Sequence, residues 1–222
     1  MLNNDTTNKI QDIISGTYID WQTDTCTATR NFLCGSYLPS TTVKKDFENN
    51  SKVKKEQEIA LVKYVNDINL WMETPPETDR FLTEGGEAAV YLSPDGMSVI
   101  KLNDAIYYST WLDFFTSLLL HNQIFQATKY ELIGFVKNHG CLQAALSQQF
   151  VISDSAVNLS DVKFFLEYNG FENTKRNDYY NSELGIILED IHDENVIINS
   201  GIIFFIDTVF YVDLERKRKI DS

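Results

Sequence analysis

The sequence has too little positive charge, too few paired cysteines and too short apolar runs for several classes of protein. Its 19 Lys and Arg against 32 Asp and Glu give a formal net charge of −13, which disfavours nucleic acids and anionic membranes as main partners. The cysteines, Cys26, Cys34 and Cys141, contain no C-x-x-C and predict neither a disulfide framework nor a zinc site. No apolar run could span a bilayer, and no signal-peptide pattern is present. We therefore expect a cytoplasmic protein with no membrane and no nucleic-acid partner.

Apolar and aromatic residues are well represented. The 222 residues are 43% hydrophobic and 13% aromatic, which predicts a folded globule with a real core. Residues 1–52 are polar, and we expect them to form an extension with little regular structure. An apolar stripe predicts a helix over residues 53–72, ended by Pro75-Pro76. The basic run Arg216–Lys219 is expected to be a solvated tail.

The stretch Gly185–Tyr211 carries the strongest chemical signal. It reads as a strand, an acidic loop, and a hairpin turned by Asn199-Ser200-Gly201. Asp190, Asn195 and Asp207 each stand at a strand end, where the hairpin would hold them near one another. Phosphoryl transfer needs a carboxylate that orients the acceptor hydroxyl and hard oxygen ligands for Mg²⁺, and such residues also commonly cap turns.

A second signal precedes it in the chain. Strands are predicted at Ala88–Leu92 and Ser98–Leu102 around the turn Pro94-Asp95-Gly96. Gly85 and Gly86 come before the first strand, and Lys101 lies in the second. A glycine turn allows backbone to approach a phosphate closely, and a strand lysine can bind α- and β-phosphates.

The residues between these two signals are predicted to form a helix, two strands and a second helix. The first helix covers Trp111–Phe125, with Thr110 as a possible N-cap. Strands are expected at Tyr130–Val136 and Leu142–Gln149, a linker at Phe150–Ser153 and a short helix at Ser160–Tyr168. Asp113 is a candidate partner for Lys101 but equally a cap of its own helix. His121 and Asn122 are expected to have core or capping roles.

The order of these motifs resembles the protein-kinase-like superfamily. Val99-Ile100-Lys101 resembles the V-A-I-K strand, and Val90 aligns with the valine after the glycine loop. The D-x-H-x-x-N pattern that includes His192 is closest to aminoglycoside and choline phosphotransferases. The phrases that carry a closer resemblance, over roughly residues 54–213, to the kinase domain of polyvalent proteins of phages and conjugative elements are EGGEAAVYLSPDG, VIKLNDAIYY, TWLDFF, HNQIF, YELIGF, ILEDIHDENVI and FFIDTVF.

The resemblance implies an α+β, protein-kinase-like fold with two lobes. After the polar extension 1–52, residues 53–152 would form a helix and an antiparallel small-lobe sheet, and 153–222 an abbreviated large lobe. The implied cofactors are ATP and Mg²⁺, with Gly85, Gly86, Val90, Lys101 and Asp113 on the nucleotide side. Asp190 would act as base, and Asn195 and Asp207 as metal ligands.

Two functions follow as hypotheses. The first is an ATP- and Mg²⁺-dependent phosphotransferase that acts on a protein or small-molecule hydroxyl, and AMP transfer by the same fold is a variant of it. The second is an inactive, kinase-shaped binding module encoded by a mobile element. The imperfect glycine loop, Leu188 and Glu189 in place of His-Arg, and the short stretch after Asp207 favour the second hypothesis. Asp207-Thr208-Val209 in place of D-F-G is a further departure from the kinase pattern. The joint presence of Lys101, Asp190, Asn195 and Asp207 favours the first.

Overall fold

The structure is a computed structural model that describes residues 3–36, 47–86 and 88–213, so the basic run at 216–219 lies outside the described part. It is a mixed α+β fold in which every paired strand runs antiparallel to its neighbours. The larger sheet has the order β1-β2-β3-β5-β4. Its strands are β1 (Phe81–Glu84), β2 (Ala88–Leu92), β3 (Ser98–Asn103), β4 (Tyr130–Asn138) and β5 (Cys141–Gln149).

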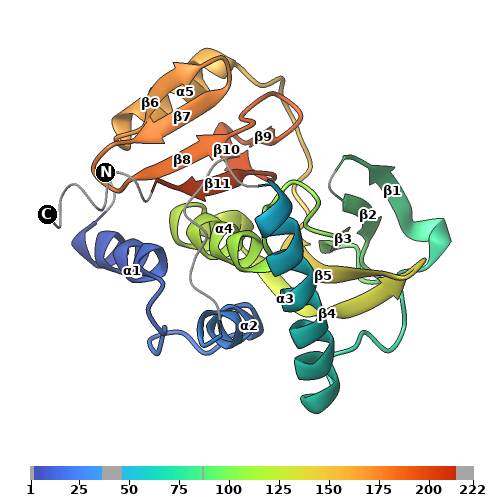
Figure 1. Cartoon of the computed structure of the whole chain (residues 1–222). Coiled ribbons are helices and arrows are strands. Elements are labelled where there is room, and N and C mark those ends of the chain that lie inside the picture. The colour runs from blue at the N-terminus through green and yellow to red at the C-terminus, as the bar shows by residue number, and fades with distance from the viewer. Residues whose placement is uncertain (1–2, 37–46, 87, 214–222) are drawn as a thin grey trace, which may run out of the picture.

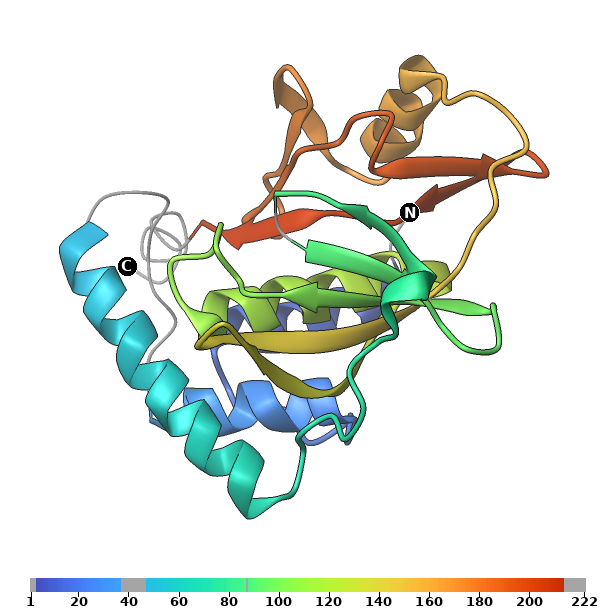
Figure 2. The same cartoon turned by 90° about the vertical axis from the view of Figure 1, so that its right-hand side faces the viewer.

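A second group of elements follows β5 in the chain. It begins with helix α5 (Leu159–Tyr168) and contains a four-stranded sheet of order β11-β8-β7-β6 and a β9–β10 hairpin. The strands are β6 (Glu172–Lys175), β7 (Asp178–Asn181), β8 (Ile186–Glu189), β9 (Val196–Asn199), β10 (Ile202–Phe205) and β11 (Val209–Val212). Figures 1 and 2 show this group together on one side of the larger sheet.

Helix α4 (Trp111–Ile124) is the central element between these groups. The hydroxyl of Thr110 caps it by accepting the N–H of Asp113 at 3.1 Å. Strand β11 packs along it, and the N–H of Phe210 donates to the Ser117 hydroxyl at 2.9 Å. On the other side α4 contacts the N-terminal helices, so that almost every residue from Trp111 to Asn122 is buried.

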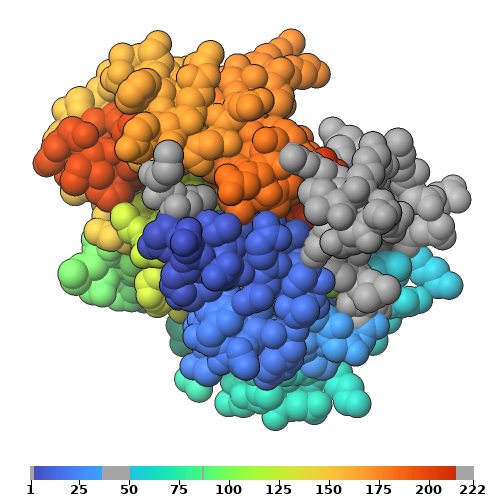
Figure 3. All heavy atoms as spheres, turned by 90° about the vertical axis from the view of Figure 1, so that its left-hand side faces the viewer, coloured from blue at the N-terminus to red at the C-terminus, as the bar shows by residue number. Residues whose placement is uncertain are grey.

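The expectation that residues 1–52 have little regular structure is wrong. Helices α1 (Asn4–Ser15), α2 (Thr25–Cys34) and the first residues of α3 (Phe47–Asp67) lie there, and α1 and α2 form a continuous patch on one face of the molecule (Figure 3). The polar residues that suggested a coil are helix caps: Asn3 caps α1 and Asp24 caps α2. Composition alone cannot separate a cap from a coil, because both favour the same residue types.

Buried polar side chains join α1 and α2. The guanidinium of Arg30 donates to the carbonyl oxygen of Ile13 at 2.7 Å and also to that of Thr17. The Asn31 side chain accepts the N–H of Ile19 at 3.1 Å and donates to its carbonyl at 2.8 Å. These contacts supply donors to carbonyl groups in the last turn of α1 and just after it, where a helix leaves carbonyls without intrahelical partners.

Helix α3 supports the start of α4 and then leads into the larger sheet. The Lys54 ammonium donates to the carbonyl oxygens of Ala105 and Tyr108 at 2.6 and 3.2 Å, and Gln57 accepts the N–H of Leu112 at 3.1 Å. The helix was predicted at residues 53–72 but spans Phe47–Asp67. It ends early because residues 70–72 run beside β4, where the Met72 N–H donates to the Phe135 carbonyl. Gly134 permits this approach, since a Cβ at that position would lie 3.1 Å from the Leu70 carbonyl oxygen.

The other predicted elements are confirmed within two residues at either end. They are the strands that became β2, β3, β4 and β5, the helices α4 and α5, and the strands β8, β9 and β10, which were expected at Gly185–Leu188, Val196–Ile198 and Ile202–Ile206. The strands β1, β6, β7 and β11 were not predicted. For β1 and β6 the reason is that both are exposed at every position, so neither shows an apolar alternation. No helix of the described residues is long and apolar enough to cross a membrane.

Candidate nucleotide and metal site

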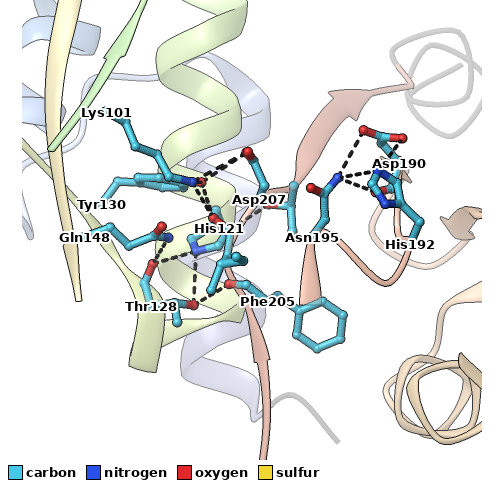
Figure 4. A network of polar contacts seen from close by, with 12 residues as sticks. Lys101, His121, Thr128, Tyr130, Gln148, Asp190, His192, Asn195, Phe205 and Asp207 are labelled. Atoms are coloured by element: carbon cyan, nitrogen blue, oxygen red, sulfur yellow. Dashed lines mark hydrogen bonds and ion pairs between the residues drawn. The ribbon is translucent and has the colours of Figure 1, made fainter. Parts of the chain in front are cut away.

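Lys101 lies in β3, and its side chain is buried against the residues that follow the β9–β10 hairpin. Only 9% of the Lys101 side chain is exposed. Its ammonium donates to the carbonyl oxygen of Ile206 at 2.8 Å and lies 3.6 Å from Oδ2 of Asp207 (Figure 4). Burial of an ammonium group is costly without such partners. The fold therefore brings together two residues that the sequence analysis assigned to phosphate and metal.

Asn195 and Asp207 stand on the two sides of the β9–β10 hairpin. The register pairs Val196 with Phe205, and beyond that pair the Asn195 carbonyl accepts the N–H groups of Ile206 and Asp207 at 3.0 and 3.4 Å. Turn chemistry at residues 199–201 thus determines which side chains meet at the open end of the hairpin. The Asp207 side chain is 40% exposed, so its carboxylate is available to a ligand.

Asp190 lies at the end of β8 with its carboxylate held by neighbours in the same loop. The Asn195 amide nitrogen donates to the Asp190 carbonyl at 2.9 Å and to Oδ2 at 3.1 Å. The His192 Nε2 atom lies 3.4 Å from the other carboxylate oxygen. Asp190 has a φ of 66°, a left-handed conformation that Asp and Asn tolerate better than most residues.

Because the Asn195 nitrogen faces Asp190 and His192, its amide oxygen lies on the side of Asp207 (Figure 4). This orientation leaves an amide oxygen and a carboxylate directed to one region. No group of three or more His, Cys, Asp or Glu side chains among the described residues could hold a metal ion by itself. Two oxygen ligands suit Mg²⁺ when phosphate oxygens and water supply the rest.

The turn that contains Gly85 and Gly86 forms one wall of the cleft. The N–H of Gly85 donates to the Ala88 carbonyl at 3.0 Å, and Gly85, Gly86 and Val90 all line the cleft. A Cβ at Gly86 would collide with the Tyr107 hydroxyl, whereas one at Gly85 would meet open space. Of these two glycines, only Gly86 lies so close to a neighbouring side chain that a Cβ would displace it.

One cleft of about 880 Å³ connects all of these residues. Lys101, Asp190, Asn195 and Asp207 line it, as do Phe150 and Val151 of the segment after β5. This volume lies within the usual range for small-molecule and cofactor pockets, about 300–1,000 Å³. Acidic side chains of Glu84, Asp178, Glu189 and Glu194 also line the cleft.

Asp113 is not part of this arrangement. The side of α4 that faces Lys101 presents Phe114 and Leu118, which line a small void beside the ammonium. The Asp113 carboxylate instead acts on Lys54, where it opposes the lowering of the Lys54 pKa that burial causes. The structure therefore gives Lys101 no acidic partner from α4, and the cap of this helix is the Thr110 hydroxyl, which accepts the Asp113 N–H.

Sequence reasoning missed the residue that contacts Lys101 most closely from the sheet. Tyr130, only 4% exposed, lies with its ring centroid 5.3 Å from the Lys101 ammonium. Its hydroxyl donates to the Ile206 carbonyl at 2.9 Å. A buried tyrosine needs a partner for its hydroxyl, and the alternation Tyr130, Leu132 on the buried side of β4 was the signal available in the sequence.

His121 and Asn122 have the core roles that were expected. His121 is fully buried, with Nδ1 at 2.7 Å from the Thr208 hydroxyl and Nε2 at 2.8 Å from the Thr128 carbonyl. Burial lowers its pKa from 6.5 to about 4, so the ring is neutral at pH 7. Because Nε2 faces a carbonyl it carries the proton, and Nδ1 accepts from Thr208.

The glycine hairpin, the strand lysine and the Asp–Asn–Asp trio on one cleft are the parts of a kinase-type nucleotide site. Over residues 54–214 the chain matches the family described as "Serine/Threonine/Tyrosine Kinase found in polyvalent proteins". The match covers well over half of the chain, and the chain therefore belongs to this family. Membership implies a kinase-like fold, the use of ATP and phosphotransferase activity as a class. No curated protein matches the sequence.

Proposed function

We propose that the protein is an ATP- and Mg²⁺-dependent phosphotransferase that transfers the γ-phosphate of ATP to a hydroxyl of a protein or small-molecule acceptor. The supporting observation is that Lys101, Asp190, Asn195 and Asp207 line a single cleft. In this proposal residues 53–152 form the small lobe and residues 153–222 the abbreviated large lobe. The proposal includes a cytoplasmic location and assigns no role to nucleic acid or membrane.

Lys101 binds phosphate oxygens in this proposal. Its ammonium already lies in the cleft beside Asp207, and a bound phosphate would share that positive charge. Gly85 allows the backbone of the β1–β2 turn to approach the phosphates, since the space above it is open. Phe150 and Val151 also line the cleft, and in this proposal the backbone of this linker binds the adenine.

Asn195 and Asp207 would hold the metal ion. Their side-chain oxygens face one region of the cleft, and both are the hard oxygen ligands that Mg²⁺ prefers. Mg²⁺ held there would supply positive charge to the phosphates of the nucleotide. The Asn195 amide hydrogen bonds to Asp190 at 2.9 and 3.1 Å keep the ligand oxygen turned toward Asp207.

Asp190 orients the acceptor hydroxyl and accepts its proton. Its side chain is 59% exposed in the cleft, which gives an acceptor access to the carboxylate. His192 and Asn195 each contact it, and these contacts fix its position before an acceptor arrives. Such positioning contributes much of the rate in phosphoryl transfer.

A kinase-shaped binding module without catalysis is the second candidate. The observation that favours it is the absence of an acidic partner for Lys101 on the facing side of α4, where Phe114 and Leu118 lie. In that case the cleft would bind nucleotide without turnover, or bind another ligand altogether.

Thermal unfolding with ATP, with and without Mg²⁺, tests whether the cleft binds nucleotide and metal. ATP with Mg²⁺ at 100 times the dissociation constant is expected to stabilise the protein by about 2.7 kcal/mol. Lys101→Ala and Asp207→Asn should lose this stabilisation. Asp193→Asn is the matched control, because it removes a charge from the same loop at a residue that does not line the cleft.

Product analysis then identifies the reaction. Formation of ADP with label from the γ-phosphate on an acceptor supports phosphotransfer, whereas release of pyrophosphate indicates AMP transfer. Asp207→Asn should lower the rate on the order of 10²-fold or more. Nucleotide binding without either product would support the binding module, and no response of the wild type to any nucleotide would refute both nucleotide-based candidates.

A further inference from the structure

We propose that Tyr130 is the positioning residue that fixes Lys101 and Asp207 for phosphate and metal, in place of an acidic side chain from α4. This inference rests on the proposed function. It follows from the contacts of one buried hydroxyl group, that of Tyr130, with Lys101, with Asp207 and with the Ile206 carbonyl that precedes Asp207.

The Lys101 ammonium has its closest contacts away from α4. They are the Ile206 carbonyl at 2.8 Å, the Tyr130 hydroxyl at 3.5 Å and Asp207 Oδ2 at 3.6 Å. The helix face beside it presents Phe114 and Leu118, which have no group that could form a hydrogen bond or an ion pair with the ammonium. The direction of the Lys101 side chain is therefore set from β4 and the hairpin.

The Tyr130 hydroxyl contacts Lys101 and also the two other groups that lie close to the Lys101 ammonium, the Ile206 carbonyl and the Asp207 carboxylate. It donates to the Ile206 carbonyl at 2.9 Å, lies 3.4 Å from Oδ1 of Asp207 and accepts from Lys101 at 3.5 Å. Its ring lies 5.3 Å from the Lys101 nitrogen, a distance at which an aromatic face attracts a cation. One side chain thus restrains the lysine, the metal-binding aspartate and the peptide unit before that aspartate (Figure 4).

Tyr130 is itself held rigidly. The Asn122 side chain accepts the Tyr130 N–H at 2.7 Å and donates to its carbonyl at 2.8 Å. The ring packs on His121 with centroids 4.6 Å apart, and His121 is bonded to Thr208 at 2.7 Å. Through these contacts α4 controls the site indirectly: it orients Tyr130 and Thr208, and they orient Lys101 and Asp207.

Tyr130→Phe tests the role with little disturbance of the fold. The variant keeps the ring, its contact with His121 and both backbone bonds to Asn122, and it removes a single oxygen. The Ile206 carbonyl still accepts from Lys101 at 2.8 Å, so no buried acceptor is left without a donor. Tyr180→Phe is the control, because it removes a hydroxyl that donates to Asp213 at 3.1 Å and Tyr180 does not line the cleft.

The measurement is a Mg²⁺ titration at a fixed, saturating ATP concentration, in which the melting temperature of each variant is compared with its own value without Mg²⁺. Loss of a hydrogen bond to a charged group predicts that Tyr130→Phe needs about tenfold more Mg²⁺ for half of the shift. Tyr180→Phe should need the same concentration as the wild type. A merely structural role would change the Mg²⁺-free melting temperature but not this midpoint.

Two results would overturn the inference, and they are distinguishable. If the wild type responds to ATP and Mg²⁺ and Tyr130→Phe has the same midpoint, the positioning role is wrong and the proposed function stands. If the wild type shows no response, the proposed function and the positioning role that depends on it are both wrong.

Discussion

The ammonium nitrogen of Lys101 lies 3.6 Å from Oδ2 of Asp207, although one residue belongs to an early strand and the other to the last hairpin. The Ile206 carbonyl, next to Asp207 in the chain, is closer still at 2.8 Å. At 3.6 Å the contact with Asp207 is an ion pair without a short hydrogen bond. Phosphate oxygens could therefore take over part of the Lys101 coordination at small cost, while the carbonyl keeps the side chain in the cleft.

Asp190→Asn should separate binding from transfer. Asn tolerates the left-handed φ of 66° at this position, so the loop should keep its conformation. The nucleotide- and Mg²⁺-dependent thermal shift should persist, and the rate of transfer should fall on the order of 10²-fold, the scale typical of general-base catalysis. Steady-state rates measured beside Asp193→Asn provide the comparison; equal rates in both variants would exclude Asp190 as the base.

Gly86→Ala and Gly85→Ala form a matched pair in the same turn. The new Cβ collides with the Tyr107 hydroxyl only at Gly86, so Gly86→Ala should weaken the binding of ATP more than Gly85→Ala does. Tyr107 is 57% exposed and can rotate away, which predicts a small effect on stability. Adding Tyr107→Ala to Gly86→Ala should restore binding, and failure to restore it would show that the collision is not the cause.

The buried His121 predicts an acid-sensitive fold. Its pKa is about 4 in the folded protein against 6.5 in its ordinary state, so between these values the unfolded chain binds a proton that the folded protein does not. Stability is therefore lost as the pH falls from 6.5 to 4, by about 3 kcal/mol for this group alone. Urea unfolding at several pH values measures this loss.

His121→Gln removes the titrating group and should give a shallower loss of stability in acid, from a lower value at pH 7. His139→Gln is the control, because His139 lies exposed in the β4–β5 turn and its replacement should leave the pH dependence as in the wild type. The same slope in all three proteins would show that His121 does not cause the acid sensitivity.

Arg30→Met should destabilise the contact between α1 and α2. The substitution keeps much of the apolar stem but leaves the carbonyls of Ile13 and Thr17 without the guanidinium that they share. The Ile13 carbonyl still accepts the N–H of Gly16 and Thr17 is exposed, so the cost is the loss of hydrogen bonds from a charged donor and not a buried acceptor without a partner. We expect a loss of about 2 kcal/mol in the free energy of unfolding, against almost none for Lys163→Met on the exposed side of α5.

Much of the fold could be predicted because its signals are local. The turn residues 94–96 and 199–201 and the apolar alternation around them indicate the hairpins of β2–β3 and β9–β10. The cap at Thr110 and the apolar run that follows it indicate α4. The N-terminal helices could not be predicted in this way, because α1 and α2 are short, polar helices whose stability comes from burial against α4.

The sequence by itself determined the candidate groups of the site and their order along the chain: Gly85, Lys101, Asp190, Asn195 and Asp207. It could not determine which groups contact one another. The partner of Lys101 is a carbonyl 105 residues away, and its side-chain neighbour from the sheet is Tyr130 rather than Asp113. Only the tertiary structure decides such contacts, because they depend on how β3, β4, α4 and the last hairpin pack together, and no local periodicity encodes that packing.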